Sequence, residues 1–389
     1  MCCSAPWSGL ASQFLWPGVG FALALPDLSG CRRHGGADLA ITNHLSISES
    51  GDSFVAEPKQ PIINVAIDDG FRQTKIVTST GFKLSIPSVA RTGFTITSVN
   101  GDAGEGGYET EGKRYTVHAD IDGEDTRFDD YATSPINRVL VHHVMQMADL
   151  AGKPVALCTG VPFQTYFRAA SSEINNEMVA AKIANLNVPV APLNGREQPQ
   201  IVRQQVTAQG LTAYIDYMTD DKGGYREGRR RESPYAVVDI GGRTTDCVTV
   251  LAGGESLDHA ASGTGNIGVS NIYDLIDAAL VKRFGQRLRL ATLDGVARNR
   301  FIRWRGEQHD VSAVVDAAVE EVAQQVVREL KRRIGDAGEM DAVLLTGGGA
   351  VLMHATLQRA YPHCIVMDEP GFANARGMLK ILNFGGGHG

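Results

Sequence analysis

The sequence lacks the features that define several protein classes. Its 389 residues include only six cysteines, and these show no repeated spacing, which argues against a disulfide framework or a paired zinc motif. The single long apolar stretch, Leu10–Leu25, is interrupted by Gln13 and Pro17 and is too short to span a bilayer. No Lys or Arg precedes Arg32, whereas a secretory signal needs a positive charge ahead of its apolar core. We therefore expect a cytoplasmic protein that does not bind membranes.

Positive charge is also scarce. Against 37 Lys and Arg stand 44 Asp and Glu, which gives a net charge of −7, so nonspecific binding of nucleic acid over the whole surface is not expected. Glycine, in contrast, is abundant. Its 44 residues, about 11% of the chain, exceed the roughly 7% found on average, and they gather in loops that follow apolar runs instead of spreading as low-complexity sequence.

The chain divides into two unequal parts. Residues 1–60 show no helix or strand period, and we interpret them as a disordered leader or the product of a mis-assigned translation start. From Ile62 onward, predicted strands and helices alternate, which is typical of a layered α/β protein. A chain of this length is expected to form about two domains or lobes.

Three predicted strands run directly into turns rich in Asp or Gly. They are Ile62–Ile67 before Asp68-Asp69-Gly70, Tyr235–Val238 before Asp239-Ile240-Gly241-Gly242, and Ala342–Leu345 before Thr346-Gly347-Gly348-Gly349. Glycine turns let a phosphate chain approach several backbone N–H groups, and carboxylates suit a divalent metal. An isolated Asp-Gly turn is more often a plain β-turn. Two of them about 170 residues apart suggest that two lobes each present a phosphate hairpin to one cleft.

The third turn carries no carboxylate. Its glycines are not followed by Lys-Ser or Lys-Thr, and they form neither a P-loop nor a dinucleotide fingerprint. The turn leads toward Val351 and Leu352 as if it opens a helix. It therefore suggests a contact with a nucleoside, with a tight strand-to-helix connection as the alternative.

In this order the turns resemble the actin superfamily of ATPases, which includes actins, Hsp70 chaperones and sugar kinases. The finer resemblance is to the ParM/StbA plasmid-segregation actins of bacteria. It covers about residues 62–383 and rests on six segments, which are Ala66–Gly70 with Lys75, Cys158–Pro162 with Tyr166, Val238–Asp246, Gly265–Ser270, Thr346–Ala350 and Asn374–Met378. It implies a two-lobed actin-like (ribonuclease H-like) fold with a nucleotide in the cleft between the lobes.

The resemblance also implies a division into domains. A first lobe over residues 61–195 would be completed by a C-terminal helix at 372–383, and a second lobe would cover 196–371. Outer subdomains would lie at 91–130 and 271–310. Residues 102–130 have a charge balance of −7 and residues 281–305 one of +7. These stretches are either solvated surface or attract each other across the cleft mouth or between subunits, and such attraction should weaken with salt.

The implied cofactors are ATP and Mg²⁺. Asp68 and Asp239 would hold the hydrated metal, and with Gln205 they are the predicted catalytic residues. Gln205 would position the attacking water from early in the helix that joins the lobes, and because a glutamine is a poor base, hydrolysis is expected to be slow. The implied nucleotide-binding residues are Asp69, Gly70, Phe71, Arg72, Lys75, Gly241, Gly242, Arg243, Thr244, Gly265, Gly347, Gly348 and Gly349.

The first turn departs from the family pattern. Phe71 and Arg72 replace the small hydroxyl residues often found there, which removes one expected phosphate contact. We hypothesise that Arg72 replaces it electrostatically.

The function implied is an ATPase whose filaments segregate plasmid DNA. The predicted partners are further copies of the chain and a DNA-binding adaptor at a plasmid centromere, with no direct contact to nucleic acid. Two alternatives remain open, a bacterial actin of the cell-shape or division type and a small-molecule kinase of the same superfamily. The kinase would need an Asp poised over a substrate hydroxyl, and the sequence offers none outside the metal turns.

Overall fold

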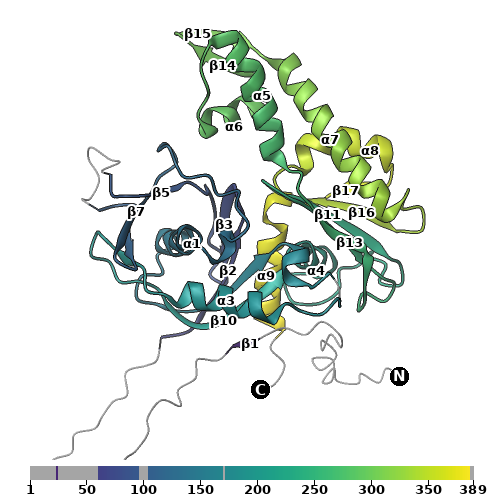
Figure 1. Cartoon of the computed structure of the whole chain (residues 1–389). Coiled ribbons are helices and arrows are strands. Elements are labelled where there is room, and N and C mark those ends of the chain that lie inside the picture. The colour runs from purple at the N-terminus through teal and green to yellow at the C-terminus, as the bar shows by residue number, and fades with distance from the viewer. Residues whose placement is uncertain (1–22, 25–59, 96–103, 170, 386–389) are drawn as a thin grey trace, which may run out of the picture.

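The computed structural model describes residues 23–24, 60–95, 104–169 and 171–385. The predicted leader, residues 1–60, lies outside these ranges apart from 23–24 and residue 60. Two lobes are visible in Figure 1, each built on a β-sheet with helices against it. This arrangement confirms the layered α/β architecture predicted from the alternating elements.

The sheet of the first lobe has six strands. Their order is β1 (Leu23–Ala24), β10 (Gln200–Ala208), β8 (Pro154–Val161), β2 (Ile63–Asp69), β3 (Gln73–Thr78) and β4 (Lys83–Pro87). Strands β10, β8 and β2 are parallel to one another, whereas β2, β3 and β4 form an antiparallel meander. The first predicted phosphate turn is therefore the hairpin between β2 and β3.

Helices cover both faces of this sheet. Helices α1 (Pro135–Met147) and α3 (Asn176–Asn187) lie on one side, and α9 (Ala373–Phe384) packs against β2 and β8. Helix α1 starts where the sequence favours a start, because the Ser134 side chain accepts a hydrogen bond from the Asn137 N–H and Pro135 occupies the first turn.

Alternation along β2 determines which carboxylate faces which side. Val65 and Ile67 belong to the core beneath α1, while Ala66 packs against Met378 and Leu382 of α9. Successive residues of a strand point to opposite faces. Asp68 therefore shares the α9 side with Ala66.

The sheet of the second lobe has five strands. Their order is β13 (Leu257–Gly265), β12 (Thr245–Val250), β11 (Tyr235–Ile240), β16 (Ala342–Thr346) and β17 (Cys364–Val366). One face packs against α5 (Val269–Phe284), α7 (Ser312–Ile334) and α8 (Ala350–Ala360). The other face packs against α2 (Phe163–Tyr166) and α4 (Leu211–Met218), which forms a shared core at the base of the two lobes.

Each lobe carries an outer part. In the first it is a sheet of β5 (Ala90–Thr92), β7 (Lys113–Val117), β6 (Gly107–Thr110) and β9 (Ala191–Pro192), and the short helix η1 (Tyr131–Thr133) adjoins α1. In the second it comprises α6 (Leu290–Asn299) and the hairpin of β14 (Phe301–Trp304) and β15 (Glu307–Asp310), beyond α5 (Figure 1). The short helix η2 (Pro370–Phe372) leads into α9.

The predicted boundary between the lobes at residues 195 and 196 is wrong. Strand β10 pairs in parallel with β8 inside the first sheet, and α4 packs against α9. The second sheet begins only at Tyr235. The segment before residue 208 was expected to start a helix, but its branched residues favour a strand, and Gly210 separates it from α4.

The structure also bears on membrane crossing. Within the described ranges, none of the helices combines the length and apolar character needed to traverse a bilayer.

Candidate active site between the lobes

The turns after β2, β11 and β16 meet at one cavity. It encloses about 660 Å³, including the part that opens to solvent. Its lining residues come from both lobes, and they are Asp68, Gly70, Phe71, Arg72, Gln73, Lys75, Gln209, Asp239, Gly241, Gly242, Thr244, Asp246, Val269, Tyr273, Asp294, Arg298, Gly347 and Gly348. The structure thus brings most of the predicted site residues together from three distant stretches of sequence.

Asp68 and Asp239 are the two carboxylates on which the prediction depends. Both are buried, with 4% and 6% of their surface exposed. Lys75 donates to Asp68 Oδ2 at 2.9 Å, and Asn374 Nδ2 donates to Asp239 Oδ2 at 2.6 Å. Burial, together with the negative charge of Asp68, raises the pKa of Asp239 to about 6. The two carboxylates therefore lie close enough to influence each other.

Gln209, rather than Gln205, reaches this pair. Its Nε2 donates to Asp68 Oδ1 at 2.8 Å. Gln209 lies between the end of β10 and the start of α4, and it lines the cavity. Gln205 lies within β10, beside Cys158 of β8, so its expected place in a helix is wrong. Four strand residues span about 13 Å, which separates Gln205 from the cavity. The signal that marks Gln209 is Gly210, because it punctuates the junction between strand and helix.

Asp69 was predicted to bind the nucleotide, but the structure directs it elsewhere. Its side chain points to the α1 side of β2, where Asn137 Nδ2 donates to Asp69 Oδ2 at 2.6 Å and Lys182 of α3 forms an ion pair with the same oxygen. Both charged side chains of this pair are fully buried. Strand alternation thus gives the neighbouring aspartates different environments.

Three more predicted residues lie beside the cavity without lining it. Arg243 forms an ion pair with Asp129 of the first lobe at 2.6 Å. Gly265 ends β13 next to Glu329 of α7. Gly349 accommodates the close packing of Ile240, because an added Cβ would lie 2.4 Å from the Ile240 side chain. The structure therefore places these three residues outside the lining of the cavity, and their contact with the nucleotide stays a prediction.

The third turn requires glycine at Gly347. Its φ is +81°, and a Cβ there would lie 2.3 Å from Asp239 Oδ1. The turn is followed by α8, as predicted. Its backbone therefore approaches the Asp239 carboxylate more closely than any side chain would allow.

Asp246 also lines the cavity, although it was not predicted as a site residue. It accepts a hydrogen bond from the Phe163 N–H at 3.0 Å and another from the Thr264 hydroxyl. Burial raises its pKa to about 7. Its place at the start of β12, paired with Asp239 of β11, is the sequence signal that could have found it.

Arg72 crosses the cleft. Its guanidinium lies 4.2 Å from the centre of the Tyr273 ring on α5, and its stem passes over Gly242. The Tyr273 hydroxyl donates to Asp294 Oδ1 at 2.7 Å, and Asp294 pairs with Arg298. No sequence pattern around α5 and α6 predicts that Tyr273, Asp294 and Arg298 line the cavity.

An ion pair and a hydrogen bond join the lobes at the cleft mouth. Arg127 of the acidic stretch pairs with Asp274 of α5 at 2.9 Å, and Arg289 of the basic stretch donates to the Asp120 carbonyl at 3.5 Å. The contacts between the outer parts thus use individual residues of either sign. A simple match of acidic stretch with basic stretch is not the arrangement observed.

The donor groups in the cavity fit a hydrated divalent cation. Across the described ranges, no three His, Cys, Asp or Glu side chains cluster as a complete set of metal ligands. Asp68 and Asp239 nevertheless present carboxylate oxygens to one space, and Mg²⁺ commonly retains several waters while bound by one or two carboxylates and a phosphate.

The chain is similar to known proteins in both halves. Residues 63–220 match the family model of the plasmid segregation protein ParM, N-terminal part, and residues 237–359 match that of the archaeal actin homologue MreB-like, C-terminal part. None of the curated proteins matches the sequence.

Solved structures resemble it over most of its length. The archaeal actin homologue Ta0583 in complex with ADP has 18% identity and a TM-score of 0.67, covering 83% of this chain and 99% of that one. A 15-stranded ParM filament from Clostridium botulinum gives 18% identity and a TM-score of 0.66, with 82% and 98% covered. The actin-like protein Alp7A gives 13% and 0.67, with 83% and 96% covered.

These similarities confirm the predicted fold class, a two-lobed actin-like fold. Within that class, the ParM match over residues 63–220 and the actin-homologue match over residues 237–359 support a ParM-type actin-like protein.

Proposed function

We propose that this protein is an ATPase that forms nucleotide-dependent filaments and segregates plasmid DNA in the bacterial cytoplasm. The observation that supports this most strongly is the convergence of Asp68 and Asp239 at a cavity bordered by three glycine turns. The ParM match over residues 63–220 favours segregation over other roles of actin-like proteins. The solved ParM filament and the ADP complex of an archaeal homologue favour assembly and nucleotide binding.

ATP and Mg²⁺ are the proposed cofactors. Asp68 and Asp239 would hold the cation through water, and when bound it would supply positive charge to the phosphate chain. Gly70 and the Gly241–Thr244 turn would offer backbone N–H groups to the phosphates. Lys75, which lines the cavity, would add a positive charge on the side of the first lobe. Gly347 and Gly348 would lie beside the adenosine.

Hydrolysis would depend on two residues that flank the carboxylates. The Gln209 amide is held by Asp68 and is positioned to orient an attacking water. Asp246, with its pKa raised to about 7, is the candidate that accepts the proton of that water.

Assembly would follow the state of the nucleotide. If ATP stabilises the conformation that makes subunit contacts and ADP weakens it, hydrolysis shifts the population from filament to free subunit. The net charge of −7 supports the proposal that contact with DNA passes through a separate adaptor protein at the plasmid centromere.

Light scattering and negative-stain microscopy would test the proposal. We expect filaments within minutes of adding Mg-ATP, persistence with a non-hydrolysable analogue, and little assembly with ADP. Phosphate release without any acceptor substrate would argue against the small-molecule kinase. A protein that neither binds nor hydrolyses ATP would contradict the proposal. Loss of plasmid stability when Asp239→Asn is introduced would test segregation separately.

A further inference from the structure

Asn374 links the two halves of the cavity through a single buried amide. It is the second residue of α9, and 3% of its surface is exposed. Its Nδ2 donates to Asp239 Oδ2 at 2.6 Å in the second lobe. Its Oδ1 accepts from the Gly210 N–H at 3.0 Å and from the Thr212 hydroxyl at 2.9 Å, both at the start of α4 in the first lobe.

The start of α4 is connected to the other carboxylate as well. Gln209 immediately precedes Gly210, and its amide donates to Asp68 Oδ1. A continuous path therefore runs from Asp68 through Gln209 and the Gly210 N–H to Asn374, and from Asn374 to Asp239. Both ends of the Asn374 amide are used, so the side chain cannot rotate without leaving a buried polar group unpaired.

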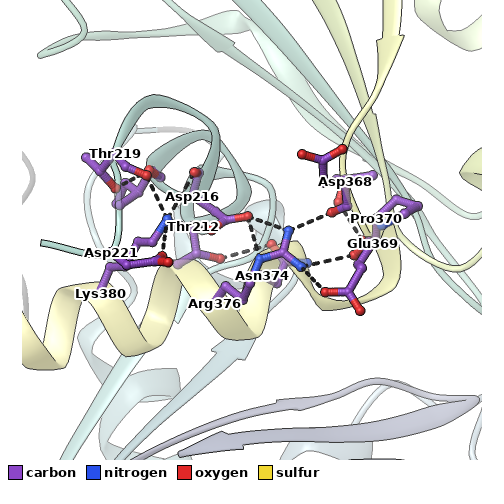
Figure 2. A network of polar contacts seen from close by, with 12 residues as sticks. Thr212, Asp216, Thr219, Asp221, Asp368, Glu369, Pro370, Asn374, Arg376 and Lys380 are labelled. Carbon is purple, nitrogen blue, oxygen red and sulfur yellow. Dashed lines mark hydrogen bonds and ion pairs between the residues drawn. The ribbon is translucent and has the colours of Figure 1, made fainter. Parts of the chain in front are cut away.

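The frame around Asn374 is rigid. Helices α4 and α9 cross in backbone contact, because a Cβ at Gly377 would lie 1.8 Å from the Thr212 carbonyl oxygen. Two residues beyond Asn374, Arg376 donates to Asp216 Oδ2 of α4 at 2.6 Å and to the Asp368 carbonyl at 2.7 Å. Figure 2 shows the Arg376 guanidinium between Asp216 and the segment that leaves the second lobe.

Lys380 continues this anchoring along α9. Its Nζ donates to Asp216 Oδ1 at 2.8 Å and to the Thr219 carbonyl at 2.7 Å (Figure 2). Asp216 is buried, so these contacts hold α4 and α9 together as one unit. A movement of the second lobe against this unit would change the hydrogen bond between Asn374 and Asp239, because through that bond the Asn374 amide contacts β11.

We propose that Asn374 is a positioning residue, which holds the Asp239 carboxylate in an orientation that depends on the position of α4. The nucleotide state and the relative position of the lobes are then coupled through this one amide. This inference rests on the proposed function, because Asp239 matters for coupling only if a nucleotide occupies the cavity. Asn374 itself contacts neither Asp68 nor the space for the phosphates, so its action on the reaction is indirect.

Two variants and one control separate positioning from a structural role. Asn374→Asp keeps the oxygen that accepts from Gly210 and Thr212 but replaces the donor to Asp239. Thr212→Val removes one of the two donors to Asn374 and leaves Asp239 untouched. The control, Arg376→Gln, breaks the network of Figure 2 on the same helix and leaves the hydrogen bonds of Asp68 and Asp239 unchanged.

Steady-state hydrolysis of ATP with Mg²⁺ gives the first readout. We expect Asn374→Asp to lower kcat about tenfold or more, because it removes the hydrogen bond to Asp239 and sets a second carboxylate beside it. Thr212→Val should lower kcat by a smaller factor. Arg376→Gln should lower the melting temperature while kcat stays within about twofold. Equal kcat losses in Asn374→Asp and Arg376→Gln would overturn the inference.

Hydrogen exchange gives a readout that does not depend on turnover. In the natural chain, a non-hydrolysable ATP analogue with Mg²⁺ should slow amide exchange at residues 209–213, and in Asn374→Asp this slowing should be lost. A natural chain that hydrolyses ATP but shows no such slowing would overturn this inference alone. A natural chain that binds no ATP would overturn the proposed function instead.

Discussion

The two phosphate turns differ in how their aspartates are compensated. In the first, Asp68 is paired with Lys75 and Asp69 with Lys182, so each carboxylate has a cation. In the second, Asp239 receives an amide of Asn374, and Asp246 receives a backbone N–H and a hydroxyl. Burial without a cation leaves the pKa of Asp239 raised to about 6 and that of Asp246 to about 7.

This difference assigns the turns different tasks. The first is already neutralised inside its own lobe and serves as a fixed wall. In the second turn, the buried carboxylates of Asp239 and Asp246 have lost water without gaining a cation. An added positive charge should therefore stabilise the second turn more than the first. A cation that bridges the lobes would therefore favour the state in which the second turn lies against the first.

The largest effect expected is on the stability of the first turn. Lys182→Met leaves the Asp69 carboxylate buried without its cation, and removing one partner of a buried ion pair costs about 3–5 kcal/mol. Urea unfolding of the nucleotide-free protein should show this loss. The double variant Asp69→Asn with Lys182→Met should recover much of it. Lys83→Met, which breaks an exposed pair with Glu369, is the control and should cost under about 1 kcal/mol.

The next largest effect is on the rate of ATP hydrolysis, and it shows whether Gln209 or Gln205 orients the attacking water. Gln209→Ala should lower kcat for ATP hydrolysis about 10- to 100-fold, because it removes the amide next to Asp68 that orients water. Gln205→Ala should leave kcat within about twofold and change mainly the melting temperature, since Gln205 lies inside β10. The opposite ranking of the two kcat values would return the role to Gln205.

The second turn should also make stability depend on pH. The folded-state pKa of Asp239 is raised from 3.8 to about 6, so its contribution is fully present below about pH 4 and is lost as pH rises through about 6. Asp239→Asn should remove this loss and gain about 3 kcal/mol at pH 7.5 in the nucleotide-free protein. Unfolding curves of both proteins at pH 5 and 7.5 would show it, and parallel pH dependences would contradict it.

The smallest effect is expected at the cleft mouth. Asp274→Asn removes the exposed partner of Arg127, and exposed pairs contribute about 0–1 kcal/mol and are screened by salt. Its effect on the critical concentration for assembly should be small at low ionic strength and vanish at high ionic strength. An effect that persists in high salt would show that the contact is not electrostatic.

Sequence reasoning predicted the turns better than the residues around them. A strand that ends in Asp and Gly identifies its own turn, so Asp68, Asp239 and Gly347 could be placed from local patterns alone. Whether Asp69 faces the cavity depends on which face of β2 meets α3, and that is fixed by Lys182, more than 100 residues away. No local pattern contains this information.

The prediction of the lobe boundary was wrong for a related reason. Residues 200–208 pair with β8 through hydrogen bonds between distant segments and form a strand. The helix that was predicted to include Gln205 therefore begins only at Leu211. Tyr273 and Asn374 likewise reach the cavity or its carboxylates from helices whose sequences show only ordinary packing patterns. Their place follows from the way in which the lobes come together.

Calorimetric titration of ATP, with and without Mg²⁺, tests the central claim most directly. If Asp68 and Asp239 together hold a hydrated cation for the nucleotide, Mg²⁺ should tighten ATP binding by about tenfold or more, and either Asp68→Asn or Asp239→Asn should abolish that gain. Tightening by Mg²⁺ that survives in both variants, or no binding of ATP to the natural chain, would contradict the account.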